Sequence, residues 1–274
     1  MTLKKSIAVN LSRVFRNHVY VSKHGLAKGL KRKGGLAFLP GFVPRSTEML
    51  REEQFIDSLD FTGQTVFDIG GDQGIYTLFF ARKVGPTGKV FTFEPNPTSY
   101  SHIVTNVQLN NFNHVKVNNL ALGAQPGKMQ LVFPEFDPGR GSADAGISQQ
   151  ISGEGTAKVI ETDVKTVDMV VANGEFPKPD FAKIDTEGFE RPVLEGMHDT
   201  IEKWHPRLFI EIHGATQELK KDNIRKVIAL LASHNYHIEH VETGKTITVE
   251  NADDAREGHI YCTYEALGNS KSKL

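Results

Sequence analysis

A glycine-rich turn, "DIGGDQG" (68–74), follows a short apolar run and is the first stretch that could bind a ligand. Gly70 and Gly71 have no Cβ and therefore let the backbone approach a ligand closely, and Gly74 allows tight packing of the next helix. A dinucleotide needs the spacing G-x-G-x-x-G, which places its pyrophosphate on a helix N-terminus. Asp72 stands where the second glycine would be and would repel a pyrophosphate. The turn therefore favours a different cofactor.

Two carboxylates at this turn indicate a cofactor that carries positive charge. Asp68 lies at the end of the apolar run and Asp72 lies within the turn, so both could offset the ammonium and sulfonium groups of S-adenosylmethionine. Glu94 follows the next apolar run, in "FTFEPNP" (91–97). An acid about twenty residues beyond such glycines accepts hydrogen bonds from ribose hydroxyls. The turn and Glu94 together predict S-adenosylmethionine as the cofactor.

Strand-like and helix-like patterns alternate along the chain. Short apolar runs predict buried strands at 65–69, 89–95, 115–123, 179–185 and 206–213. Helical periodicity predicts helices at 46–59, 75–84, 98–111, 187–203 and 223–235. We expect Ser46 or Thr47 to cap the first helix and Thr98 to cap the third. The segments 236–242 and 259–266 predict a closing antiparallel pair. Such alternation is typical of a doubly wound, Rossmann-like α/β sheet with helices on both faces.

The middle of the chain departs from this alternation. Residues 127–134 predict a strand, and the alternating segment 158–171 predicts edge strands. Between them, 135–155 is rich in turn-forming residues and predicts a long loop. A loop of that length is commonly functional, and Arg140 within it could close over an acceptor.

Charge divides the chain into an arm and a body. Residues 1–47 contain ten Lys and Arg and no Asp or Glu, whereas 48–274 contains 22 basic and 33 acidic residues. We expect 1–47 to be a basic N-terminal arm of helical pieces and loops, docked on a folded domain at 48–274. Clustered Lys and Arg could also contact a polyanion or a membrane surface, or belong to a cleaved transit peptide.

Composition predicts a cytoplasmic protein. A single cysteine, Cys262, excludes an internal disulfide framework. No apolar run approaches the roughly 18 residues of a transmembrane helix. The first residues, "MTLKKSIAVNLSRVF", make a poor signal peptide because polar residues interrupt the apolar stretch.

Four stretches together resemble the FkbM-type family of S-adenosylmethionine-dependent methyltransferases. They are "VFDIGGDQGIYT" (66–77), "FTFEPNP" (91–97), "NNLALG" (118–123), and "FAKIDTEGFERPVLEGM" (181–197) followed by "PRLFIEIH" (206–213). The last block is the most characteristic of the family. The resemblance implies a seven-stranded sheet, mostly parallel with an antiparallel last strand, as in class I methyltransferases.

The resemblance also implies which residues bind the cofactor. From the methionine end to the adenine end these are Asp68, Gly70, Gly71 and Asp72, then Glu94 at the ribose, then Pro95, Asn96, Leu120 and Ala121. Gly74 opens the helix beside them, and Asp185 would lie next to the transferred methyl group.

Family members methylate hydroxyls, so the resemblance implies O-methyl transfer to a sugar, a glycan or a small natural product. A hydroxyl must lose its proton during the transfer, which calls for a general base. Asp185 and Glu187 in "IDTEG" and Glu211 and His213 in "EIHG" stand at expected strand ends. We favour His213 as the base because the ordinary pKa of histidine lies nearest to neutrality; Asp185 is the alternative.

A divalent ion is a second way to activate the hydroxyl. Asp185, Glu211 and His213 offer ligands that suit Mg²⁺ or Mn²⁺, although we favour a metal-free reaction. Two other functions stay open: a catalytically silent member that binds cofactor or a partner, and a nucleic-acid-binding protein that uses the arm. The acidic body lacks an RNA-reading motif, so we expect no nucleic-acid partner.

Overall fold

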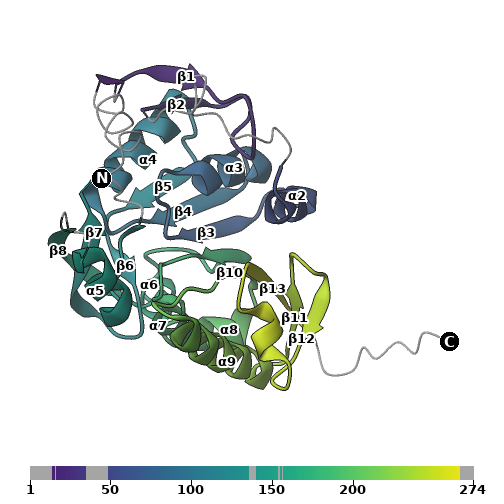
Figure 1. Cartoon of the computed structure of the whole chain (residues 1–274). Coiled ribbons are helices and arrows are strands. Elements are labelled where there is room, and N and C mark those ends of the chain that lie inside the picture. The colour runs from purple at the N-terminus through teal and green to yellow at the C-terminus, as the bar shows by residue number, and fades with distance from the viewer. Residues whose placement is uncertain are drawn as a thin grey trace.

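An eight-stranded sheet forms the centre of the protein (Figure 1). The structure is a computed structural model, which describes residues 14, 15, 17–34, 49–135, 140–153, 155 and 157–265. In the order of the sheet, the strands are β12 (Lys245–Ile247), β11 (Tyr236–His240), β13 (His259–Tyr264), β10 (Arg207–Glu211), β9 (Phe181–Ile184), β3 (Thr65–Ile69), β4 (Lys89–Phe93) and β5 (Val115–Asn118).

The strand directions confirm the expected class I arrangement. Neighbours from β5 to β10 are parallel, whereas the last strand of the chain, β13, lies antiparallel between β10 and β11. The short strand β12 adds an eighth member at the edge, which the sequence analysis does not include. The chain runs outward from β3 to β5 and then returns to β9 on the other side of β3. The carboxyl ends of β3 and β9 therefore meet at the switch in strand order, where open α/β sheets bind their ligands.

Helices cover both faces of this sheet (Figure 1). One face carries α2 (Arg51–Ser58), α3 (Ile75–Val84) and α4 (Pro97–Leu109), and the other carries α6 (Val167–Ala172), α7 (Glu190–Glu195), α8 (His198–Trp204) and α9 (Gln217–Ser233). Side chains alternate along each buried strand, so Val66 packs with the α3 side and Phe67 with the α9 side. A 3₁₀ helix, η2 (Ala252–Ala255), precedes β13. Among the described residues, no helix is long and apolar enough to cross a membrane.

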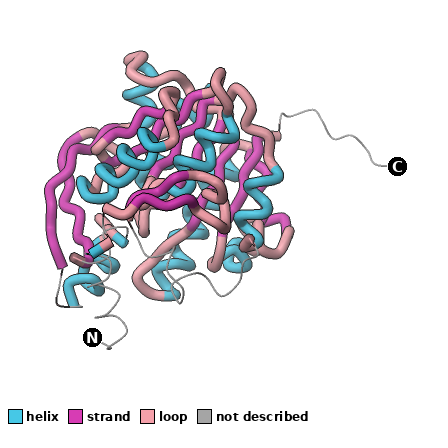
Figure 2. The backbone as a smooth tube through the Cα atoms, turned by 90° about the horizontal axis from the view of Figure 1, so that it is seen from above, coloured by secondary structure: helices cyan, strands magenta, loops and turns pink. Residues whose placement is uncertain are grey.

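A second sheet stands beside the first and corrects two expectations. Its strands are β6 (Ala121–Leu122), β8 (Ala157–Lys165) and β7 (Gly127–Pro134), and the long β7–β8 pair stands at the left of Figure 2. The segment 158–171 was expected to add edge strands to the main sheet. Its first part instead forms β8, which pairs with β6 and β7 in the second sheet. Its last part forms α6, which the Thr166 side chain caps. The expected loop 135–155 contains a helix, α5 (Ala145–Gly153).

Two helix boundaries also differ from expectation. The cap of α4 is Asn96, whose side chain accepts a hydrogen bond from the Thr98 backbone N–H, so Thr98 itself lies inside the first turn. The expected helix 187–203 is divided into α7 and α8 at Gly196. A Cβ there would lie 1.9 Å from the carbonyl oxygen of Gly123, so close backbone contact requires glycine at this break.

The start of the domain and the arm are described only in part. The expected caps of α2, Ser46 and Thr47, lie outside the described residues. Within the arm, β1 (Val19–Val21) and β2 (Lys31–Lys33) form an antiparallel hairpin, so the expectation of helical pieces and loops is wrong for this part. The hairpin docks on α4, where the Asn106 and Asn110 side chains accept the backbone N–H groups of β2.

Candidate active site

The turn after β3 is held against the end of β9. Gly70 has φ of 85° and donates its N–H to the carbonyl of Phe93, the last residue of β4. A Cβ at position 70 would lie 1.7 Å from the carbonyl oxygen of Asp185. The backbone of the turn and that of Asp185 therefore lie in direct contact, which only glycine permits.

The substitution Gly70→Ala tests this contact. We expect it to lower the free energy of unfolding by about 2–5 kcal/mol. Alanine would have to adopt a positive φ, and its Cβ would overlap the carbonyl oxygen of Asp185. Gly174→Ala is the matched control: Gly174 has φ of 68°, but a Cβ at that position would meet no atom within 4 Å. The control should lose only about 1–2 kcal/mol. Equal urea-denaturation midpoints for the two variants would contradict the contact.

Backbone hydrogen bonds hold the carboxylate of Glu94 in place. Its carboxylate is 6% exposed and accepts two backbone hydrogen bonds of 2.8 Å, from Asp72 and from Asn96. Burial raises the pKa of Glu94 to about 8, although the two N–H donors oppose the shift. Each oxygen keeps a lone pair for a further donor. The side chain is thus fixed in place with free acceptor capacity.

A cavity of about 850 Å³, including its open mouth, lies beside Glu94. It lies at the ends of β3, β4 and β9 and is walled on the far side by β6, β7 and the 140–143 segment. The expected site residues that line it are Gly70, Asp72, Glu94, Pro95, Ala121, Asp185 and Glu187. Its apolar wall is formed by Ile69, Phe93, Met129, Leu131 and Phe189. The mixture of acidic and apolar side chains in its lining suits a nucleoside with a charged tail.

Five expected cofactor residues do not line this cavity. Asp68 is buried beneath the turn and accepts a hydrogen bond from Thr77. The others pack or cap nearby elements: Gly71, Gly74, Asn96 and Leu120. These residues shape the turn and the neighbouring segments behind the cavity.

A buried lysine, which the sequence analysis does not identify, joins the turn to the end of β9. Lys183 is 4% exposed, and its ammonium lies 3.0 Å from Asp185 Oδ2, 3.1 Å from the Gly70 carbonyl and 3.9 Å from Asp68 Oδ1. Burial opposes its charge, but Asp185 and Asp68 outweigh burial and raise the pKa of Lys183. The lysine within the apolar run "FAKID" could have indicated this contact in the sequence, because a charge buried in a strand needs partners of opposite charge.

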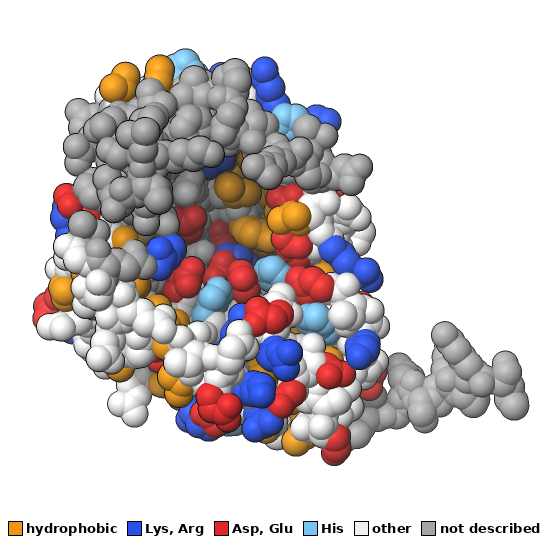
Figure 3. All heavy atoms as spheres, in the orientation of Figure 1, with side chains coloured by type: hydrophobic (Ala, Val, Ile, Leu, Met, Phe, Trp, Pro, Cys, Tyr) orange, Lys and Arg blue, Asp and Glu red, His pale blue; other side chains and the backbone are white. Residues whose placement is uncertain are grey.

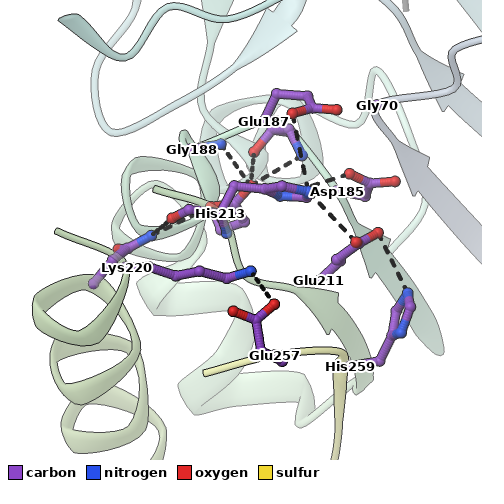
Figure 4. Close-up of polar contacts among 12 residues, drawn as sticks. Gly70, Asp185, Glu187, Gly188, Glu211, His213, Lys220, Glu257 and His259 are labelled. Carbon is purple, nitrogen blue, oxygen red and sulfur yellow. Dashed lines mark hydrogen bonds and ion pairs between the residues drawn. The ribbon is translucent and has the colours of Figure 1, made fainter. Parts of the chain in front are cut away.

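Carboxylates surround His213 on several sides (Figure 4). Its Nδ1 lies 3.1 Å from Glu190 Oε1 and 3.9 Å from Asp185 Oδ1, and its Nε2 lies 3.5 Å from Glu211 Oε1 and 3.9 Å from Glu187 Oε2. The structure therefore brings together the four residues singled out at the strand ends. It adds the fully buried Glu190, which looks in sequence like an ordinary acid at a helix start.

These surroundings shift several pKa values. Burial lowers the pKa of His213, but hydrogen bonds to Glu190 and Glu211 outweigh it and raise the value to about 11. Burial raises the pKa of Glu187 to about 7, with partial opposition from His213. Burial also favours protonation of Glu211, but hydrogen bonds from His213 and His259 hold its pKa well below the usual value. The His213 ring is therefore protonated at neutral pH.

The segment that follows β7 closes one side of the site. Ser142 is fully buried, forms a bridge with Val132 and donates its hydroxyl to the Glu187 carbonyl at 2.5 Å. Glu187 has φ of 52°, an uncommon value for a non-glycine residue. Acidic and histidine side chains line the hollow seen in Figure 3. The contact with Ser142 holds Glu187 at the cavity in this strained conformation.

The strand order and the position of the cavity define a class I, Rossmann-like methyltransferase fold. A family model described as "Methyltransferase FkbM domain" matches residues 68–238. The chain therefore belongs to the FkbM methyltransferase family, whose methyl donor is S-adenosylmethionine, and the resemblance found in the sequence is confirmed.

Individual relatives are more distant. The chain is 28% identical over 176 residues to "Methyltransferase 1" of Beauveria bassiana, covering 57% of this chain and 69% of that protein. It is 27% identical over 151 residues to the "Hexuronic acid methyltransferase AglP" of Haloferax volcanii, covering 54% of this chain and 56% of the relative. A crystal structure of methyltransferase FkbM from Methylobacillus flagellatus aligns with a TM-score of 0.47 at 19% identity, covering 76% of this chain and 45% of the other. The chain thus spans about half the length of two of these three proteins.

Proposed function

We propose that this chain transfers the methyl group of S-adenosylmethionine to a hydroxyl oxygen of a sugar, either in a glycan or in a small natural product. The observation that supports this proposal is the shared cavity. Glu94, at the end of β4, and Asp185 and Glu187, after β9, line the same space. A carboxylate suited to ribose thus stands in one pocket with two acids suited to an acceptor.

The residues present fit the cofactor. Glu94 would accept the ribose hydroxyls, since both of its oxygens are oriented by backbone N–H groups. Phe93, Ala121 and Met129 offer apolar surface for adenine, and Asp72 offers negative charge for the ammonium group. When bound, the cofactor supplies an activated methyl group, which passes to the acceptor oxygen and leaves S-adenosylhomocysteine.

The acceptor proton must pass to a group of the protein. We assign this role to Glu187 rather than to His213, which the sequence favours. Glu187 lines the cavity, and its backbone is fixed by Ser142. The His213 ring does not line it, and both of its nitrogens face carboxylates at 3.1 and 3.5 Å. Asp185 Oδ2 is engaged by Lys183, which leaves Asp185 to orient the acceptor.

A sugar hydroxyl is an acceptor that agrees with the name of one of the relatives reported above. That relative is a hexuronic acid methyltransferase. A panel of neutral sugars, amino sugars and uronic acids, with a methyl-labelled donor, tests the proposal. Mass spectrometry should find a methyl ether on at least one sugar. Transfer only to nitrogen or carboxylate positions would contradict O-methylation.

Cofactor affinity should depend on pH through Glu94. The ribose diol donates hydrogen bonds to the ionised carboxylate, whereas the free protein holds Glu94 protonated below its pKa of about 8. Binding must therefore release a proton below pH 8, and affinity should rise about tenfold per pH unit from pH 6 to 8 and then level off. The probe is 5′-methylthioadenosine, which keeps the diol but has no amino-acid group. A flat profile would show that Glu94 does not meet the ribose.

A further inference from the structure

We propose that Asp185, Glu211 and His213 form a binding site for one divalent metal ion of the Mn²⁺ or Mg²⁺ type. Ligand atoms from these three residues all lie within 4.8 Å of one another. They come from the ends of two adjacent parallel strands, β9 and β10. The set is mixed, with two carboxylates and one imidazole, and this composition suits such ions together with water or an oxygen-bearing substrate.

In each of the three residues, one atom is hydrogen-bonded or ion-paired to a residue outside the set, which we call its outer partner. Lys183 donates to Asp185 Oδ2 at 3.0 Å, His259 lies 3.4 Å from Glu211 Oε2, and Glu190 lies 3.1 Å from His213 Nδ1. The remaining atoms are Asp185 Oδ1, Glu211 Oε1 and His213 Nε2. An ion that binds Nε2 must displace the proton that the ring carries at neutral pH, so binding releases a proton. Outer partners of this kind orient metal ligands before the ion arrives.

Glu190 is the strongest of these outer partners. It is fully buried and accepts the Gly188 backbone N–H at 2.9 Å, and the Asn223 amide donates to its other oxygen at 3.3 Å. Asn223 also donates to the His213 carbonyl at 3.1 Å. The carboxylate therefore fixes the imidazole from behind and turns Nε2 toward Glu211, which is the usual carboxylate–histidine arrangement at a metal.

Acidic groups outnumber the basic groups around this set, even when the protonated His213 ring and the Lys183 ammonium are counted. Within 3.9 Å of His213 lie carboxylate oxygens of Asp185, Glu187, Glu190 and Glu211. A second group on the surface, His198, Asp199 and Glu202, has similar ligand types but is exposed. It lacks the buried outer partners, so it serves as a comparison rather than as a second site.

The use of the ion rests on the proposed function, whereas its binding does not. Asp185 lines the cofactor cavity, so an ion held there would border the acceptor. A metal at this position would hold the acceptor hydroxyl and lower its pKa, while Glu187 takes the proton.

Titration of the full chain with Mn²⁺, followed by the electron paramagnetic resonance signal of the free ion, tests the site. We expect one bound ion per chain. Glu211→Gln and His213→Ala should each remove that binding, and Glu190→Gln should weaken it roughly 10- to 100-fold, as is typical of an outer partner. Glu202→Gln, in the exposed comparison group, should leave it unchanged. No bound ion in the wild type, or loss only in Glu202→Gln, would overturn the proposal.

Parallel calorimetry with S-adenosylhomocysteine separates this inference from the proposed function. Retained cofactor binding shows that each variant is folded. In the wild type, cofactor binding without Mn²⁺ binding would overturn the metal site and leave the methyltransferase proposal standing. Mn²⁺ binding by the wild type without cofactor binding would overturn the methyltransferase proposal and leave the metal site standing. Methyl transfer at full rate in EDTA would overturn the role of the ion in the reaction, whereas loss that Mn²⁺ restores would support it.

Discussion

Replacement of Glu94 by alanine is expected to abolish measurable binding of S-adenosylhomocysteine. In the proposed complex this carboxylate accepts both ribose hydroxyls, and burial makes such hydrogen bonds strong. Each hydrogen bond to a charged group contributes about 1.5–3 kcal/mol. Loss of two such bonds corresponds to a decrease of roughly 100-fold or more in affinity. Titration calorimetry on the wild type and the variant measures this change.

Glu161→Ala is the matched control for Glu94. Glu161 lies on β8, is exposed and pairs with Lys128 at 2.7 Å, away from the cavity. The control should bind S-adenosylhomocysteine as the wild type does. A Glu94→Ala protein that is folded by circular dichroism and still binds within about threefold of wild type would refute the role of Glu94.

Replacement of Glu187 by glutamine is expected to lower the turnover number about 10²- to 10⁴-fold, the usual contribution of general acid–base catalysis. Glutamine keeps the size of the side chain and cannot accept the proton. Cofactor affinity should stay within about threefold, because Glu187 contributes no ribose contact in this proposal. Single-turnover methyl transfer and calorimetry, carried out on the same preparations, separate these two effects.

Glu195→Gln provides the control for this prediction. Glu195 ends α7, eight positions further along the chain, and pairs with Arg191 on the exposed side of the helix. Its substitution should leave turnover unchanged. Full activity of Glu187→Gln would exclude Glu187 as the proton acceptor and return attention to Asp185 and His213.

The central sheet and the glycine-rich turn after β3 could be predicted because their signals are local. Apolar runs such as 65–69 read directly as buried strands, and glycines at a strand end mark a close backbone approach. The contact between Gly70 and Asp185, however, joins positions far apart in the chain. The spacing of residues along the sequence does not indicate that these two backbones lie in contact.

Features that depend on tertiary packing could not be predicted. The loop expected at 135–155 holds α5 because Ser142 and Gly146 pack on distant segments, Glu187 and Ala215. Glu190 looks like a helix-start acid, and its role beside His213 depends on the position of β10. The pKa of His213 likewise follows from the carboxylates of Glu190, Glu211 and Asp185, which converge only in the fold, so its ordinary value was a poor guide to its chemistry.

A crystal structure of the chain with S-adenosylhomocysteine is the most direct test of the cofactor cavity. We expect the ribose hydroxyls within hydrogen-bonding distance of Glu94, adenine against Phe93 and Ala121, and the sulfur facing Asp185. Density for the ligand elsewhere, with Glu94 still bound only to the backbone of Asp72 and Asn96, would contradict the assignment of this cavity.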